Sequence, residues 1–267
     1  MLKLQDIRLT FHRGTVNERR ALDCVNLHLS PGDFATVIGS NGAGKSTMLN
    51  VIAGSYEADS GKILLDGEDI TLRKEYKRAN KIGRLFQDPL KGTAPNMTIE
   101  ENLGLAYLRG KKRGMGSGLK KTDEAFFKEM LACLGLGLED RLKTQVKLLS
   151  GGQRQALTLL MATIVTPKLL LLDEHTAALD PKTALQIMRI TDGIVRENQI
   201  TTLMITHNIK DALSYGNKTV VMGQGRVVLI LEGEERAGMT VERLMQLYSA
   251  NTQDAFSDKM ILYSRHT

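Results

Sequence analysis

The sequence predicts an α/β protein built on a mostly parallel sheet. Several stretches are unbroken runs of apolar or β-branched residues, as expected of strands buried on both faces; they are residues 34–38, 169–172, 201–205 and 219–222. Between these runs, apolar residues recur at helical spacing, most clearly at Ala184, Ile187, Met188, Thr191, Ile194 and Val195. Buried strands that alternate with amphipathic helices are the pattern of an α/β core.

Two further regions depart from that alternation. Near the start, Ile7, Leu9 and Phe11 and then Val25, Leu27 and Leu29 follow the two-residue period of half-buried antiparallel strands. From about residue 88 to 164 strand signals disappear, and Ala125, Phe126, Met130 and Leu134 keep helical spacing. We therefore expect one domain over 1–267, with an α/β core and N-terminal antiparallel β subdomain (1–87 and 165–232), an inserted helical subdomain (88–164) and a short C-terminal extension (233–267).

Composition limits the classes of protein. With 42% hydrophobic residues among 267, the chain should fold around a sizeable core. Its longest apolar runs are far shorter than the roughly 20 residues that span a bilayer, and its start lacks a secretory signal, so we expect a cytoplasmic location. The two cysteines are isolated, which indicates neither a disulfide framework nor a metal site. In the extension, Val241, Leu244, Met245 and Tyr248 predict a helix packed on the core.

The net charge of +6 leaves several partners open. Much of the excess gathers near residues 109–121, where Arg and Lys alternate with Gly, as in a flexible exposed loop. Nucleic-acid binding through that loop would require interleaved aromatic side chains for base stacking, and these are missing. We expect no nucleic-acid partner, while a membrane-facing role or simple solvation both remain open.

A phosphate-binding loop follows the predicted strand 34–38. The segment satisfies the pattern G-x-x-x-x-G-K-S/T and opens a helical run; it consists of Gly39, Ser40, Asn41, Gly42, Ala43, Gly44, Lys45, Ser46 and Thr47. Glycines let backbone N–H groups surround phosphate oxygens, and the helix N-terminus adds partial positive charge. In such a loop Lys45 reaches the β and γ phosphates, and the Ser46 hydroxyl can ligate Mg²⁺.

A second helix start suited to phosphate lies at Leu149-Ser150-Gly151-Gly152-Gln153, before the helical run 154–164. Acidic residues follow the buried run 169–172 at the strand end, where α/β sheets bind ligands. There Asp173 can hold Mg²⁺ through water, and Glu174 can orient or deprotonate an attacking water. His207 follows the strand 201–205 and could contact the γ-phosphate or that water.

Together these motifs resemble the ABC (ATP-binding cassette) ATPase family over essentially residues 1–232, in content, order and spacing. The resemblance implies a P-loop NTPase core of the RecA-like type, with ATP and Mg²⁺ as cofactors. It makes Gln87 the glutamine-loop ligand of Mg²⁺ and water, Glu174 the catalytic base, His207 the switch histidine and Asp180 the D-loop acid. It also implies that Phe11 stacks on adenine, for which any aromatic face is suited.

Two positions depart from the family pattern. Phe11 stands where Tyr is more usual, which removes a hydroxyl and keeps the stacking surface. His175 stands where Pro is common, which puts the rigidity of that loop in question. The segment 173–181 looks like a subgroup of bacterial importers, some of whose partner binding proteins resemble tryptophan or tyrosine binders.

The resemblance also implies how the protein works. Two copies form a head-to-tail homodimer in which each ATP lies between Lys45 and Ser46 of one copy and Ser150 and Gly152 of the other. The dimer then drives transmembrane permease subunits from the cytoplasmic face of the membrane, and an extracytoplasmic solute-binding protein is a further candidate partner. The implied function is the ATPase of an importer for a small solute such as an amino acid.

A second hypothesis is an ABC-type ATPase that drives a non-transport partner, either an envelope regulator or a soluble assembly factor. Translation factors of this type normally carry two cassettes, whereas this chain has one P-loop and one match to the family's signature segment, residues 149–153. Chromosome-maintenance relatives need long heptad coiled coils, and the sequence has none. Sequence alone leaves the envelope regulator and the iron-sulfur assembly factor open.

Overall fold

A computed structural model describes residues 1–109 and 121–251 of the chain. These residues divide into two compact units, each described here by itself; the first comprises Met1–Arg78 and Gln199–Thr267, and the second comprises Ala79–Asn198. Across the described ranges, no helix combines the length and the apolar character needed to cross a membrane. The greater part of the predicted basic loop, residues 110–120, lies outside the described residues.

An antiparallel sheet opens the first unit, in the strand order β2-β1-β4-β5. Its strands are β1 (Leu2–Phe11), β2 (Arg19–Leu29), β4 (Ser60–Leu65) and β5 (Glu68–Asp69). In β1 and β2 the apolar residues of the alternating pattern are buried except for Phe11, which is half-buried, and Leu2 pairs with Leu29 across the ladder. The predicted antiparallel strands are confirmed.

The first unit also contains a mainly parallel set of strands in the order β10-β9-β3-β8. They are β3 (Phe34–Ile38), β8 (Thr201–Ile205), β9 (Lys218–Gly223) and β10 (Arg226–Glu232). The strand β3 runs parallel to both β8 and β9, and all five of its residues are buried. Only β10 is antiparallel, since it follows β9 through a tight turn. The unbroken apolar runs of the sequence therefore mark central parallel strands, as predicted.

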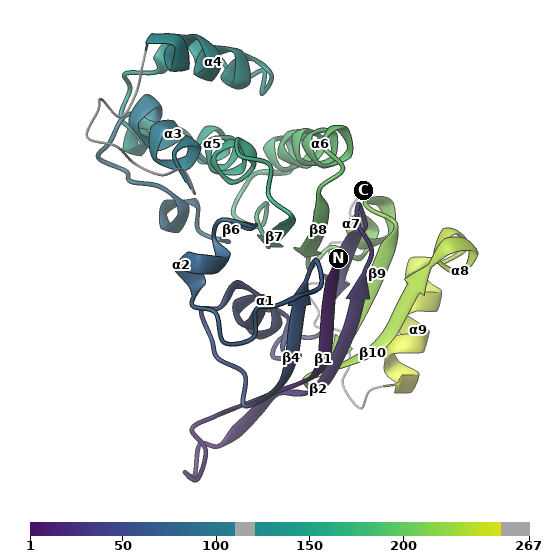
Figure 1. The fold of residues 1–267 in the computed structure, drawn as a ribbon. Helices are drawn as coiled ribbons and strands as arrows, with labels where there is room; N and C mark the ends of the chain where they lie inside the picture. Colours follow the sequence, from purple (N-terminus) through teal and green to yellow (C-terminus); the bar gives the residue numbers. More distant parts are fainter. Residues whose placement is uncertain (110–120, 252–267) are drawn as a thin grey trace. The chain divides into compact units, whose positions relative to one another are not determined.

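The described residues of the first unit form the helices α1 (Lys45–Ala53), α2 (Glu75–Arg78), α7 (Ile209–Ser214), α8 (Gly233–Ala237) and α9 (Val241–Asn251). The last of these confirms the helix predicted in the C-terminal extension (Figure 1). In α9, Leu244 and Tyr248 are buried together with Ile38 of β3 and Val221 of β9. Helix α9 is therefore part of the hydrophobic core of this unit.

The second unit has one parallel strand pair, β6 (Ile82–Leu85) with β7 (Leu169–Asp173). Its helices are α3 (Ile99–Tyr107), α4 (Lys121–Ala132), α5 (Gly151–Thr163) and α6 (Pro181–Glu197), with short 3₁₀ turns at Pro89–Gly92, Glu139–Arg141 and Val146–Leu148. The helices predicted from the spacing in 125–134 and 184–195 are present. Strand β6 was not anticipated, because its four residues include Gly83 and Arg84 and show neither alternation nor an unbroken apolar run.

Candidate functional site

The P-loop joins β3 to α1 in the first unit, and its backbone requires glycine. Gly42 and Gly44 have φ angles of 82° and 97°, a left-handed region that other residues rarely adopt. A Cβ on Gly44 would also lie 2.6 Å from the carbonyl oxygen of Ala21 in β2. The loop is thus packed against β2, and its curvature depends on residues without side chains.

The start of α1 fits an anionic ligand. Its N-cap residue, Gly44, provides no side-chain hydrogen bond to the first turn, where backbone N–H groups and the helix dipole attract phosphate. Lys45 is only 5% exposed, and its Nζ donates to the carbonyl oxygens of Gly39 (2.7 Å) and Ser40 (2.9 Å). Ser46 is exposed on the first turn of the helix. The loop therefore presents a fixed cation, an exposed hydroxyl and a cradle of N–H groups.

Phe11 is the last residue of β1, in the same unit, and its ring contacts a second aromatic side chain. Its ring makes an edge-to-face contact with Tyr56, with centroids 5.4 Å apart and planes at 82°. Opposite Phe11 on β2, Arg19 donates a hydrogen bond to the Gly42 carbonyl oxygen at 3.0 Å. An aromatic platform and a second cation thus accompany the P-loop, and the sequence reasoning identified neither Tyr56 nor Arg19.

His207 follows β8, the strand that runs parallel to β3. The backbone N–H of Thr206 donates to the Val37 carbonyl oxygen at 3.2 Å, which extends the pairing to the strand ends. Because parallel strands end at a common edge, His207 and the P-loop leave the sheet on the same side. Asn208 then caps α7 through hydrogen bonds from the N–H groups of Lys210 and Asp211. The structure thus places His207 and the P-loop at the same edge of these parallel strands.

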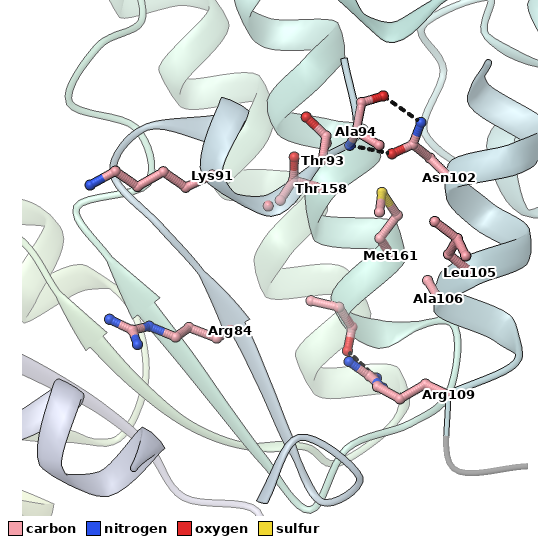
Figure 2. A pocket seen from close by; sticks show the side chains of 12 residues that line it. Arg84, Lys91, Thr93, Ala94, Asn102, Leu105, Ala106, Arg109, Thr158 and Met161 are labelled. Atoms are coloured by element: carbon pink, nitrogen blue, oxygen red, sulfur yellow. Dashed lines mark hydrogen bonds between the residues drawn. The ribbon is translucent and has the colours of Figure 1, made fainter. Parts of the chain in front are cut away.

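In the second unit, Gln87 is exposed just after β6. The following chain borders an open pocket of about 430 Å³ (Figure 2). Three cationic residues line it, namely Arg84, Lys91 and Arg109, and no carboxylate is among its described lining residues. Asn102, which is buried, fixes the wall of the pocket. Its Oδ1 accepts a hydrogen bond from the Ala94 N–H at 2.8 Å, and its Nδ2 donates to the Ala94 carbonyl oxygen at 3.1 Å. The pocket is a preformed surface of positive character.

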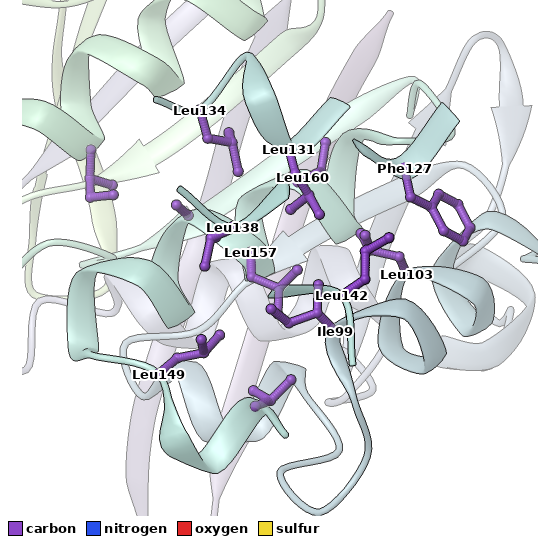
Figure 3. Packing of buried hydrophobic residues seen from close by; sticks show 13 residues of the cluster. Ile99, Leu103, Phe127, Leu131, Leu134, Leu138, Leu142, Leu149, Leu157 and Leu160 are labelled. Carbon is purple, nitrogen blue, oxygen red and sulfur yellow. The ribbon is translucent and has the colours of Figure 1, made fainter. Parts of the chain in front are cut away.

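A cluster of buried leucines and other apolar residues from α3, α4, α5 and the turns between them positions α5 (Figure 3). Leu157 and Leu160 of α5 pack there with Leu103 of α3 and Leu131 of α4. Fully burying one such side chain contributes about 1.5–3 kcal/mol. The N-terminus of α5 is therefore held by a rigid hydrophobic layer.

The signature segment forms that N-terminus, as the sequence predicted. The Ser150 hydroxyl accepts the N–H of Gln153 at 3.2 Å, and the Gln153 side chain accepts the N–H of Ser150 at 3.3 Å. This capping box uses the Ser150 oxygen as an acceptor, so the hydroxyl proton can still be donated to a phosphate oxygen. A Cβ on Gly152 would overlap the methyl group of Thr183 in α6, which explains the glycine there.

The acidic segment after β7 has an unusual backbone. Asp173 ends the strand, and Glu174 adopts a left-handed conformation with φ 47°, which is a strained geometry for a residue with a side chain. His175, at the position where Pro is common, is 3% exposed and its Nε2 lies 3.2 Å from the Thr191 hydroxyl in α6. Burial lowers the pKa of His175 to about 4. The histidine therefore anchors the loop to α6 by a side-chain contact.

Asp180 begins α6 as its N-cap. Its carboxylate accepts the N–H of Thr183 at 3.1 Å, and hydrogen bonds from the Thr183 side chain and backbone lower the pKa of Asp180. Since Thr183 also contacts Gly152, the D-loop acid and the signature lie next to each other within this unit.

The predicted Mg²⁺ ligands are oxygen donors, as a hard cation requires. They are Ser46 in the first unit and Gln87 and Asp173 in the second. Among the described residues, no three His, Cys, Asp or Glu side chains are grouped so that they could hold a metal ion. Oxygen ligands of these kinds suit Mg²⁺, which usually keeps waters and binds through few carboxylates together with substrate phosphates.

Taken together, the β3–P-loop–α1 unit, the buried parallel strands and the second glycine-bounded helix start define a P-loop nucleotide-binding α/β protein. The ABC transporter family model matches residues 22–177. A tyrosine transport ATP-binding protein of Clostridioides difficile is 43% identical over 249 residues, covering 93% of this chain and 98% of that protein. The thiamine import ATP-binding protein ThiQ of Yersinia pseudotuberculosis is 35% identical over 207 residues, covering 76% and 81%.

Solved structures of ATP-binding cassettes have the same fold as this chain. The dimeric ATP-binding cassette MJ0796 in a post-hydrolysis state with ADP and Pi superimposes with a TM-score of 0.74 at 30% identity, over 87% of this chain and 98% of that one. The ADP conformation of the ABC transporter cassette MJ1267 gives 0.76 at 27% identity, over 93% and 98%. The chain belongs to the ABC transporter family and is one of its ATPases.

Proposed function

We propose that this chain is the ATP-hydrolysing subunit of a bacterial membrane importer for an aromatic amino acid such as tyrosine. The observation that carries the proposal is the 43% identity to a tyrosine transport ATP-binding protein across 98% of that protein. The likeness of the segment 173–181 to importers for such solutes, noted from the sequence, supports the same substrate class. The subunit would act at the cytoplasmic face of the membrane with permease subunits, and a solute-binding protein outside would deliver the solute.

In the proposed working form, two copies bind two ATP molecules head to tail. The P-loop N–H groups, Lys45 and the Ser46 hydroxyl of one copy bind the phosphates. Ser150, Gly151, Gly152 and Gln153 of the second copy complete the site, with Asp180 beside them. The capping geometry supports this assignment, because the Ser150 hydroxyl proton can still be donated to a γ-phosphate oxygen. Phe11, with its ring edge-on to Tyr56, provides the stacking surface for adenine.

For the chemical step we assign Glu174 as the base that orients the attacking water and takes its proton. His207 and Gln87 contact the γ-phosphate and that water, so their contacts depend on whether the γ-phosphate is present. Mg²⁺ would be held by Ser46, by Gln87 and, through water, by Asp173. When bound, the ion would neutralise charge on the phosphates. The left-handed backbone at Glu174 supports its role, since such strain tends to occur at functional sites.

The conformational change that follows hydrolysis would then be transmitted to the permease subunits near Gln87. The pocket between α3 and α5 is the proposed docking surface, because Arg84 and Lys91, on either side of Gln87 in the chain, line it. Its cationic lining of Arg84, Lys91 and Arg109 favours a partner segment with negative charge.

The first test concerns the assigned base. Glu174→Gln should retain ATP binding and lose nearly all turnover, because the amide cannot accept the proton. Glu197→Gln, the same change on the exposed end of α6, should hydrolyse ATP like the wild type. Hydrolysis by Glu174→Gln at the wild-type rate would refute the assignment.

The second test concerns the partners and the solute. The Glu174→Gln protein, purified from native membranes with ATP, should bring down a polytopic membrane protein, and cells lacking the chain should lose uptake of labelled tyrosine. Recovery of soluble partners alone would instead favour an assembly ATPase. Recovery of the membrane protein with normal tyrosine uptake would favour an envelope regulator or another solute.

A further inference from the structure

A tyrosine in the C-terminal helix touches the P-loop. The Tyr248 hydroxyl of α9 accepts a hydrogen bond from the backbone N–H of Ser40 at 3.1 Å, across 208 positions of sequence. Tyr248 is 1% exposed and is among the largest fully buried side chains of the chain. A buried phenol usually has a hydrogen-bond partner, and here that partner belongs to the nucleotide-binding loop.

The ring of Tyr248 is held in place by the core of the first unit. It packs with Leu244 of its own helix, with Ile38 at the end of β3 and with Val221 of β9. The preceding helix α8 is fixed as well, since Arg236 donates to the carbonyl oxygens of Ala212 and Tyr215 at 3.1 and 2.6 Å. The C-terminal segment is thus anchored to the unit at α8 and again along α9.

Ser40 is consequently held at both of its backbone polar groups. Tyr248 accepts its N–H, and Lys45 donates to its carbonyl oxygen at 2.9 Å. The same Lys45 ammonium bonds the Gly39 carbonyl oxygen at 2.7 Å. A Cβ on Gly39 would overlap the Met222 carbonyl oxygen of β9, so this side of the loop is also closely packed. The first turn of the loop is therefore fixed by β9, α9 and the lysine that binds phosphate.

We propose that Tyr248 is a positioning residue for nucleotide binding, which holds the entry of the P-loop through the Ser40 N–H and so makes the C-terminal helix part of the ATP site. The inference rests on the proposed function for the ligand and extends it to a segment that carries none of the recognised motifs. A loop that is already ordered loses less conformational freedom when it binds phosphate. Removing the hydroxyl should therefore weaken nucleotide binding more than it weakens the fold.

The test is Tyr248→Phe, which keeps the ring and its packing and removes only the hydroxyl. Tyr76→Phe is the matched control, because Tyr76 is a 67% exposed residue of α2. Hydrogen exchange of the nucleotide-free protein, followed on peptides that contain Ser40, reports the bond directly. The dissociation constant for ATP, and KM and kcat for its hydrolysis, report its consequence.

We expect Tyr248→Phe to speed exchange at Ser40 and to raise the dissociation constant and KM about 3- to 10-fold, the effect of one neutral hydrogen bond. The value of kcat should stay within about twofold, because the bond to the Ser40 N–H positions the loop and Tyr248 is not among the residues proposed to act on the water or the γ-phosphate. Faster exchange with unchanged nucleotide affinity would assign Tyr248 a structural role and overturn the inference. Unchanged exchange would overturn it as well. Wild-type protein that binds no ATP would instead refute the proposed function, and the inference with it.

Discussion

The buried imidazole of His175 makes the stability of the protein depend on pH in a predictable way. It is 3% exposed, lies against Thr191, and has its pKa lowered from 6.5 to about 4 by burial. The Thr191 hydroxyl donates to the Ile187 carbonyl oxygen at 2.8 Å, so it accepts from His175, whose neutral form therefore carries its proton on Nε2. Protonating the second nitrogen would place a charge in the core.

The size of the effect follows from the two pKa values. Well above pH 6.5 the histidine is neutral in both the folded and the unfolded states and contributes no pH dependence. As the pH falls below 6.5 the unfolded chain binds a proton that the folded chain does not, so the free energy of unfolding decreases. The expected loss is about 1 kcal/mol at pH 5.5 and about 3 kcal/mol at pH 4, where the folded state also begins to bind the proton.

The assay is urea unfolding at several pH values between 7.5 and 4, for the wild type and for His175→Gln. Glutamine keeps an N–H near the position of Nε2 and cannot titrate, so other carboxyl and histidine contributions cancel in the difference. As the pH falls, the wild-type free energy of unfolding should decrease more than that of the variant. The difference between the two decreases should equal the losses given above. Parallel curves would refute the reasoning, as would a midpoint near 6.5 for the His175 imidazole in an NMR titration.

Three further predictions follow from particular contacts. Gly44→Ala should raise the dissociation constant for ATP more than about tenfold, because φ 97° and the Ala21 carbonyl both oppose a side chain; Gly67→Ala, with φ 78° and open space around it, should leave binding unchanged. Phe11→Ala should raise KM for ATP about 2- to 10-fold through lost stacking, and wild-type kinetics in that variant would exclude an adenine platform. Asn102→Ala should lower the free energy of unfolding by about 2–3 kcal/mol, since the buried amide makes three hydrogen bonds, whereas Asn96→Ala at an exposed site should have little effect in the same urea titration.

Much of the fold and of the candidate site was predictable because the relevant signals are local. A phosphate cradle needs its glycines, lysine and serine next to one another, so residues 39–47 can be recognised in the sequence without a structure. The helix start at Ser150 is equally local, since a capping box spans four residues. Buried parallel strands such as β3 and β7 are visible as unbroken apolar runs. The placement of Glu174 and His207 directly after such strands follows from the same signals.

Other features were invisible because no local rule encodes them. Strand β6 is only four residues long and includes Gly83 and Arg84, so it is a strand by virtue of its pairing with β7. The question raised by a histidine in place of proline in the acidic loop was answered only by Thr191, sixteen positions away on α6. Tyr56 follows the end of α1, and nothing in its neighbourhood signals that its ring meets Phe11.

The sequence by itself therefore determined the fold class, the family and the candidate site residues, because backbone cradles, helix caps and strand-end acids are made by neighbours along the chain. Only the tertiary structure decided what supports those residues. Tyr248 lies 208 positions from Ser40, and their contact exists because α9 packs on the strands that lead into the P-loop. Hydrophobic burial fixes that packing, and it joins segments without regard to their separation in sequence.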